Sequence, residues 1–115
     1  MSSKVKGVTT VFAHWCPHCD PPALDATARI GKELRVPIRL LDIDIPEQEK
    51  EADDIVKKYG DWIEDYLIPQ VFLELADGST RHIFTGNPGV VSLTEEGFSN
   101  LLKSDWFKDL KQAVN

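Results

Sequence analysis

The chain has 115 residues, of which 42% are hydrophobic and 28% are charged. This composition excludes intrinsic disorder, and the length suits one domain, so we predict a single domain over residues 1–115. The net charge of −6 argues against nucleic acid or an anionic membrane as a partner, because an acidic surface is not attracted to either.

The beginning of the chain, Met1 to Lys6, lacks the apolar stretch of a signal peptide, and no apolar run of about eighteen residues occurs anywhere. We therefore expect a cytoplasmic protein. In that reducing compartment a closely spaced cysteine pair is usually catalytic or metal-binding rather than structural.

The first predicted element is a buried strand from Val5 to Ala13, and a Cys-x-x-Cys motif, Cys16-Pro17-His18-Cys19, follows at its C-terminal end. Pro17 suits the first turn of a helix, where a backbone amide is not needed. The helix continues from Ala23 to Leu34, and the Pro21-Pro22 pair predicts a kink in its early part. The residues expected to face inward are Leu24, Ala28 and Ile30.

The second predicted strand runs from Ile38 to Asp44, and Pro46 begins the second helix. Gly60 is expected to end this helix in the left-handed conformation. Residues 61–67 are predicted to add one more helical turn. The apolar face of the second helix consists of Ala52, Ile55, Val56 and Tyr59.

Two further strands, Gln70 to Leu75 and Thr80 to Thr85, flank Asp77-Gly78, which is a strong hairpin signal. The last segment returns to helix. Ser92 with Glu95 has the pattern of a capping box, and Ser104-Asp105 could start a separate helix. The apolar positions at helical spacing in this segment are Phe98, Leu101, Leu102, Trp106, Leu110 and Val114.

The resulting order, βαβαββα with a cysteine pair after the first strand, resembles the thioredoxin fold. Trp15-Cys16-Pro17-His18-Cys19 resembles that family's Trp-Cys-x-x-Cys active site, Ile68-Pro69 falls where the family carries a cis-proline, and Thr85-Gly86 resembles its groove-lining glycine. The resemblance covers roughly residues 5 to 113. It implies an α/β domain with a central four-stranded mixed sheet flanked by helices, and we expect a monomer.

The chemistry of the motif follows from its position at a helix N-terminus, where unpaired amides and the helix dipole stabilise a thiolate. We expect Cys16 to be the nucleophile and Cys19, one turn later, to resolve the mixed disulfide. A structural staple is the weaker interpretation, because a ring of about four residues restricts the unfolded chain by only about 2 kcal/mol.

The residues around the cysteines are expected to tune the site or bind substrate. Pro17 fixes the first turn. A partly charged His18 would favour the thiolate, which resembles the DsbA-type oxidants; the alternative is a solvated side chain without a tuning role. Trp15 is expected to offer an apolar face to a peptide. The resemblance implies that Ile68, before a cis Pro69, presents backbone groups to substrate and that Gly86 lines the groove.

One departure from the thioredoxin pattern concerns the buried carboxylate beneath the second cysteine and its lysine partner, because the aligned positions here are Thr10 and Leu40. Loss of one partner alone would leave an unpaired buried charge, so the joint replacement fits a more apolar core. It also removes the usual proton acceptor for Cys19. Water, His18 or the substrate would have to accept that proton.

The function that these features favour is a thiol–disulfide oxidoreductase that reduces or exchanges protein disulfides and receives electrons from an upstream thiol reductase. The only redox group expected is the Cys16-Cys19 pair, with no cofactor and no metal. The alternatives are a glutathione-linked, glutaredoxin-like protein, a non-catalytic adaptor, and a protein that binds zinc or an iron–sulfur cluster. In the zinc case the two thiolates would be joined by His14, His18 or Asp20.

Overall fold

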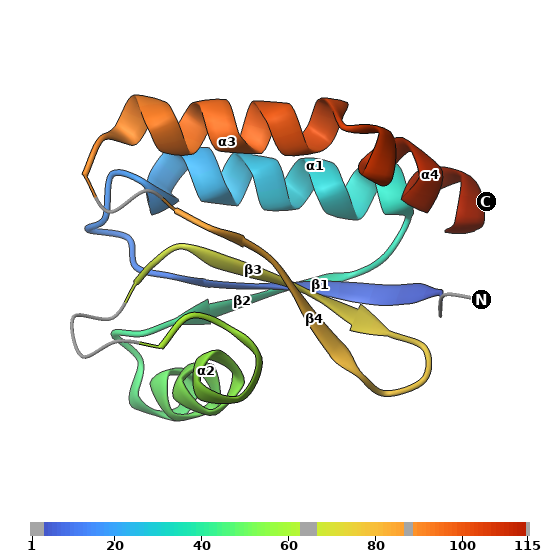
Figure 1. The fold of residues 1–115 in the computed structure, drawn as a ribbon. Coiled ribbons are helices and arrows are strands. Elements are labelled where there is room, and N and C mark those ends of the chain that lie inside the picture. The colour runs from blue at the N-terminus through green and yellow to red at the C-terminus, as the bar shows by residue number, and fades with distance from the viewer. Residues whose placement is uncertain (1–3, 63–66, 87–88, 115) are drawn as a thin grey trace.

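The computed structural model describes residues 4–62, 67–86 and 89–114. Within these ranges, four strands and four α-helices follow one another in the predicted βαβαββα order, with the last helical segment divided in two (Figure 1). A short π-helical turn, η1 (Cys19–Ala23), precedes the first α-helix. The elements are β1 (Val5–Phe12), α1 (Leu24–Leu34), β2 (Ile38–Asp42), α2 (Pro46–Tyr59), β3 (Gln70–Leu75), β4 (Thr80–Thr85), α3 (Val91–Lys103) and α4 (Asp105–Val114).

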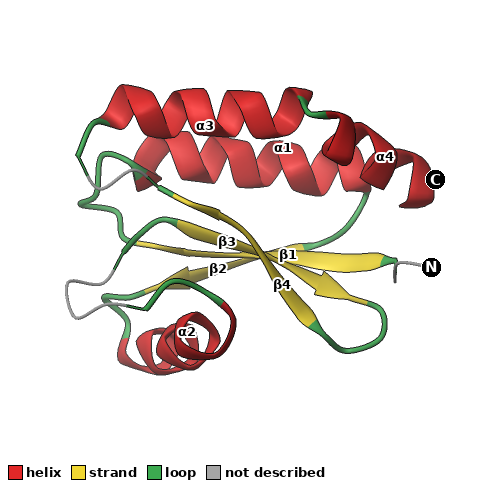
Figure 2. Ribbon diagram, in the orientation of Figure 1, coloured by secondary structure: helices red, strands yellow, loops and turns green. Residues whose placement is uncertain are grey.

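The four strands form one mixed sheet in the order β2-β1-β3-β4. β1 is parallel to β2 and antiparallel to β3, and β3 and β4 form the predicted antiparallel hairpin. Helices α1 and α3 cover one face of the sheet and α2 covers the other (Figure 2). This confirms the predicted thioredoxin-like arrangement, although β1 and β2 end earlier than predicted, at Phe12 and Asp42.

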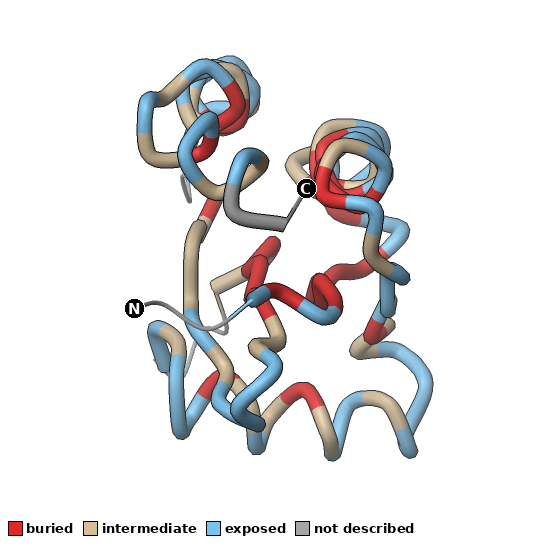
Figure 3. The backbone as a smooth tube through the Cα atoms, turned by 90° about the vertical axis from the view of Figure 1, so that its right-hand side faces the viewer, coloured by how far each residue is buried: buried red, intermediate tan, exposed pale blue. Residues whose placement is uncertain are grey.

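The core lies on both faces of the central strands, and the helices turn their buried residues toward the sheet (Figure 3). Alternate residues of β1 point to opposite faces. Val8 therefore packs under α1, α3 and α4 with Ile30, Leu73 and Phe107, whereas Val11 packs toward α2 in a second cluster. That second cluster consists of Val11, Leu41, Ala52, Val56 and Phe72.

The buried face of α1 differs from the prediction. Ile30 is buried and Leu24 is half-buried, but Ala28 is exposed. Ala26, Thr27, Ile30, Gly31 and Leu34 are the buried positions, and their helical spacing leaves Ala28 on the opposite side of the helix.

Two predicted helix signals are wrong. Gly60 ends α2 with φ −107° and ψ −157°, which is extended rather than left-handed. α3 begins at Val91 after Val90, and no side chain caps it, so Ser92 lies inside the first turn and the capping box does not form. A left-handed residue does end α1, where Arg35 has φ 58° and the Val36 amide bonds the Gly31 carbonyl.

The remaining predictions concern the last helical segment, the hairpin and the loop before β3. The break at Ser104 is confirmed, because α4 starts at Asp105. Gly78 in the hairpin turn has φ +91°, as a glycine turn requires. The helical turn predicted over residues 61–67 falls largely outside the described residues. None of the helices in the described ranges is long and apolar enough to cross a membrane.

Gly60 is required by close packing rather than by its backbone angles. A Cβ atom there would overlap the Gln70 Oε1 atom and lie 2.8 Å from Phe72 Cζ, and both of these side chains are fully buried. We expect Gly60→Ala to lower the free energy of unfolding by about 1–3 kcal/mol, as measured by denaturant titration.

The matched control is Gly7→Ala, because its new Cβ would meet nothing closer than 3.5 Å. Equal losses of stability in the two variants would contradict the packing explanation for Gly60.

Candidate functional site

The cysteine motif lies where the C-terminal end of β1 turns into the first helical segment. The Cys16 carbonyl accepts hydrogen bonds from the amides of both Cys19 and Asp20, each at 3.0 Å, so a helical turn begins at Cys16. Pro17 is exposed within this turn. Cys16 and Cys19 pack with Phe12 and Ala13 at the end of the strand. The structure therefore places the pair at a helix N-terminus, as the sequence predicts.

The two thiols differ in their solvation. Cys19 has no exposed surface, whereas Cys16 keeps 5% of its surface. Burial raises the pKa of Cys19 strongly, and a hydrogen bond with the Cys16 side chain and the charges of Cys16 and Asp20 act in the same direction. A hydrogen bond with the Ala13 backbone offsets this only in part. Cys19 is thus a neutral thiol near pH 7. Cys16 is also buried, but it is the residue of the pair that keeps some exposed surface.

The predicted kink occurs directly after the motif. Asp20 has φ −116° and ψ 114° inside η1, and the Asp20-Pro21 peptide is cis. The Leu24 amide then bonds the carbonyls of Cys19 and Pro21, and the regular α1 helix starts there. The tandem prolines predicted the kink, but nothing in the sequence distinguished a cis from a trans bond at Pro21.

The two histidines near the motif have different surroundings. His18 is half-buried, and its Nδ1 atom lies 2.7 Å from the Thr94 hydroxyl of α3. His14 is exposed, and its two ring nitrogens lie 3.2 Å from Asp20 and 3.8 Å from Asp42. His18 is therefore not a fully solvated side chain, because one of its ring nitrogens is bonded within the protein. Its tuning role stays a prediction.

Trp15 is 66% exposed beside the motif, which leaves its ring free to contact a partner molecule. Its indole Nε1 donates a hydrogen bond to the Asp44 carboxylate at 3.3 Å. The ring is thus held at one edge while its faces remain in solvent, an arrangement suited to binding an apolar segment.

The sheet register brings the predicted proline and glycine to the same end as the cysteines. Val11 of β1 pairs with Gln70, which pairs with Thr85, so the residues beside them, Pro69 and Gly86, are neighbours. The Ile68-Pro69 peptide is cis, as predicted. The Gly86 amide donates to the Pro69 carbonyl at 2.8 Å, and a Cβ at Gly86 would lie 2.5 Å from Pro69 Cδ.

Ile68 connects this proline loop to the cysteines, because it packs against the cluster that contains Cys16 and Cys19. Ile68 therefore lies at the edge of the cluster that holds the pair. Trp15, His18, Ile68, Pro69 and Gly86 thus all lie at the cysteine end of the sheet, although their roles in substrate binding remain predictions.

Gln70 was missed by the sequence analysis. Its fully buried amide donates to the carbonyls of Leu67 and Asp61 at 2.8 and 3.0 Å and accepts from the Asp61 amide at 3.0 Å. One side chain therefore fixes both ends of the loop that leads to Pro69. A glutamine in an apolar strand is the only sequence signal, and it does not reveal the partners.

Thr10, at the position of the missing carboxylate, is not in a purely apolar environment. Its hydroxyl lies 2.6 Å from the buried Thr27 hydroxyl, which donates to the Ala23 carbonyl at 2.7 Å. Thr10 must then donate to Thr27, since a hydroxyl has one proton. Leu40 pairs with Thr10 in the sheet register but is 37% exposed. Two neutral hydroxyls thus occupy the core where the thioredoxin pattern has an ion pair.

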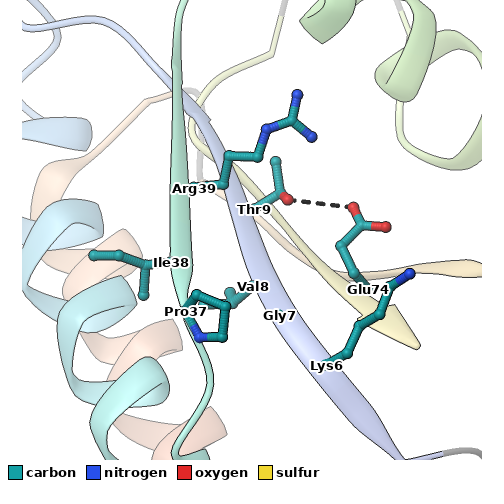
Figure 4. A pocket seen from close by; sticks show the side chains of 8 residues that line it. All are labelled: Lys6, Gly7, Val8, Thr9, Pro37, Ile38, Arg39 and Glu74. Carbon is teal, nitrogen blue, oxygen red and sulfur yellow. Dashed lines mark hydrogen bonds between the residues drawn. The ribbon is translucent and has the colours of Figure 1, made fainter. Parts of the chain in front are cut away.

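A cavity of about 290 Å³ lies at the other end of β1, away from the cysteines. It is lined by residues 6–9, 37–39 and Glu74, none of which is a predicted site residue (Figure 4). Within the described part of the chain, no group of three or more His, Cys, Asp or Glu side chains is arranged to hold a metal ion.

Comparisons of the chain with protein-family models, with curated proteins and with solved structures found no significant match. The description of the site therefore rests on the geometry of the residues themselves.

The raised pKa of Cys19 predicts its reactivity. In the Cys16→Ser variant we expect Cys19 to react slowly with iodoacetamide at pH 7, because only the thiolate attacks. Burial remains in this variant, so the rate should still rise with pH above the ordinary thiol pKa of about 9.

The control is the same variant in denaturant, where Cys19 is solvated and its rate should level off near the ordinary thiol pKa. A folded protein whose rate levels off at the same pH as the unfolded chain would contradict the assignment of Cys19 as a neutral thiol.

Proposed function

We propose that this protein is a thiol–disulfide oxidoreductase of the thioredoxin-like superfamily, which reduces or exchanges disulfides in other proteins. The observation that supports this best is the pair of unequally solvated cysteines at a helix N-terminus in a thioredoxin-like fold, with the cis Ile68-Pro69 segment packed beside them. Attack and release require different sulfurs, and the difference in burial separates the two roles.

The reaction consists of two disulfide exchanges. The Cys16 thiolate attacks one sulfur of the substrate disulfide, the substrate S–S bond breaks, and the departing thiolate takes up a proton. Cys19 then loses its proton and attacks Cys16 Sγ, which releases the second substrate sulfur as a thiolate that is also protonated. Two electrons have passed from the protein to the substrate, and the protein holds a Cys16-Cys19 disulfide. Of the two protons that the substrate thiols take up, one replaces the proton lost by Cys19 and the other comes from solvent, because Cys16 reacts as the thiolate.

Burial of Cys19 assists the order of these steps. A neutral Cys19 does not compete with Cys16 for the substrate, and it donates its hydrogen bond to the Cys16 sulfur. Once Cys16 is in the mixed disulfide, its negative charge is gone, and one cause of the raised pKa of Cys19 disappears with it. The proton of Cys19 then leaves more easily, to water, to His18 or to the departing thiolate.

The partners that fit this site are protein disulfides and a thiol reductant of the dithiol class, which returns the oxidised pair to the reduced state. The exposed Trp15 ring and the Ile68-Pro69 and Gly86 backbone would flank an extended peptide on either side of Cys16. We further propose that the protein acts as a monomer in the cytoplasm.

An insulin reduction assay with dithiothreitol as the reductant tests the activity directly. We expect the wild-type protein to accelerate reduction and Cys16→Ser to lose essentially all of this acceleration, because the attacking sulfur is removed and the remaining thiol, Cys19, is neutral and fully buried. Circular dichroism checks that the variant is folded. Equal rates for wild type and Cys16→Ser would contradict the proposed function.

Trapping with Cys19→Ser tests the substrate class. Without the resolving thiol, the mixed disulfide on Cys16 should persist and survive non-reducing electrophoresis. The Cys16→Ser/Cys19→Ser variant is the control for non-covalent capture. Recovery of adducts with glutathione alone, and with no protein, would contradict a protein-disulfide substrate and favour the glutaredoxin-like alternative.

A further inference from the structure

Thr94 is a polar residue on an otherwise apolar helix face. The buried residues of α3 are Thr94, Phe98 and Leu102, spaced four apart, and Phe98 stacks on Phe84 with ring centroids 4.0 Å apart. Thr94 has no exposed surface. A buried hydroxyl costs free energy unless it is hydrogen-bonded, so a threonine at the head of this face calls for a specific partner.

His18 is a partner of that hydroxyl, although the two residues are 76 positions apart in the chain. The distance of 2.7 Å between Thr94 Oγ1 and His18 Nδ1 is that of a strong hydrogen bond. His18 lies between the two cysteines in the sequence and directly precedes η1. The bond therefore ties the start of α3 to the motif.

A hydroxyl suits both protonation states of the imidazole. It can donate to Nδ1 of the neutral ring or accept from Nδ1–H of the imidazolium. In both cases Nδ1 faces Thr94, and Nε2 lies on the other side of the ring.

We propose that Thr94 is a positioning residue that holds the His18 ring in a fixed orientation within the Cys16–Cys19 motif and thereby favours the reduced, dithiol form of the pair. The inference rests on the proposed function and extends it, since it assigns part of the control of the redox equilibrium to α3. Thr94 acts only through the imidazole, which stabilises negative charge on Cys16.

The experiment measures the equilibrium between the dithiol and the disulfide in a series of glutathione redox buffers at pH 7. The variants are Thr94→Val, which keeps the shape but removes the hydroxyl, and Thr94→Ser, which restores it. We expect Thr94→Val to shift the equilibrium constant toward the disulfide by about fivefold, and Thr94→Ser to return it close to wild type.

A double-mutant cycle with His18→Ala separates positioning from a general structural effect. In the His18→Ala background, Thr94→Val should leave the equilibrium constant unchanged. Thr9→Val is the matched control, because Thr9 is also fully buried and bonds Glu74 on the α2 side of the sheet. It should lower stability without moving the redox equilibrium.

The proposal is overturned if Thr94→Val folds and leaves the equilibrium unchanged, or if it shifts the equilibrium equally with and without His18. If the valine variant does not fold, the test is made on the wild-type protein by measuring nuclear Overhauser contacts between the His18 ring and the Thr94 methyl group. Their presence supports a fixed orientation of the ring, and their absence overturns the proposal. Failure of the proposed function gives a different result in the insulin assay. In that case the wild-type protein does not accelerate disulfide reduction, and neither do the variants at position 94.

Discussion

The proposed chemistry of this protein depends on a difference in burial between two cysteines on one helical turn. Cys19 is closed off by Phe12 and Ala13 at the end of β1, and that burial keeps it neutral. Cys16 begins the turn and retains contact with solvent. The two cysteines therefore differ in how readily each can carry a negative charge, because a charged sulfur is far more costly in the interior than at the edge, and the proposed roles follow from that difference.

The sheet explains why the other parts of the site lie where they do. β1 is hydrogen-bonded to a strand on each side, so its position in the sheet is fixed, and the cysteine motif follows its C-terminal end. The same register places Pro69 and Gly86 beside that end, and Gln70 holds the loop that leads to Pro69 through three hydrogen bonds. The site is thus built from segments that are far apart in sequence but adjacent in the sheet.

Local patterns predicted most of the fold. Hydrophobic periodicity, the Asp77-Gly78 turn and the motif after the first strand sufficed for the element order, because each acts over a few residues. The errors arose where distant packing decides. Gly60 is needed because Gln70 and Phe72 approach it, and the hydrogen-bond partner of Thr94 becomes visible only when α3 packs beside His18. The kink after Cys19 was predictable from its prolines, whereas the cis bond at Pro21 was not.

The most direct test of the unequal roles uses the intact dithiol protein. Reduced protein is mixed with an excess of oxidised glutathione, the reaction is quenched with acid after successive short times, and the earliest adduct is located by peptide mass spectrometry. The account predicts that glutathione is found first on Cys16 and that a Cys16-Cys19 disulfide replaces it. A first adduct on Cys19 would contradict the account, because the buried sulfur would then be the one that attacks.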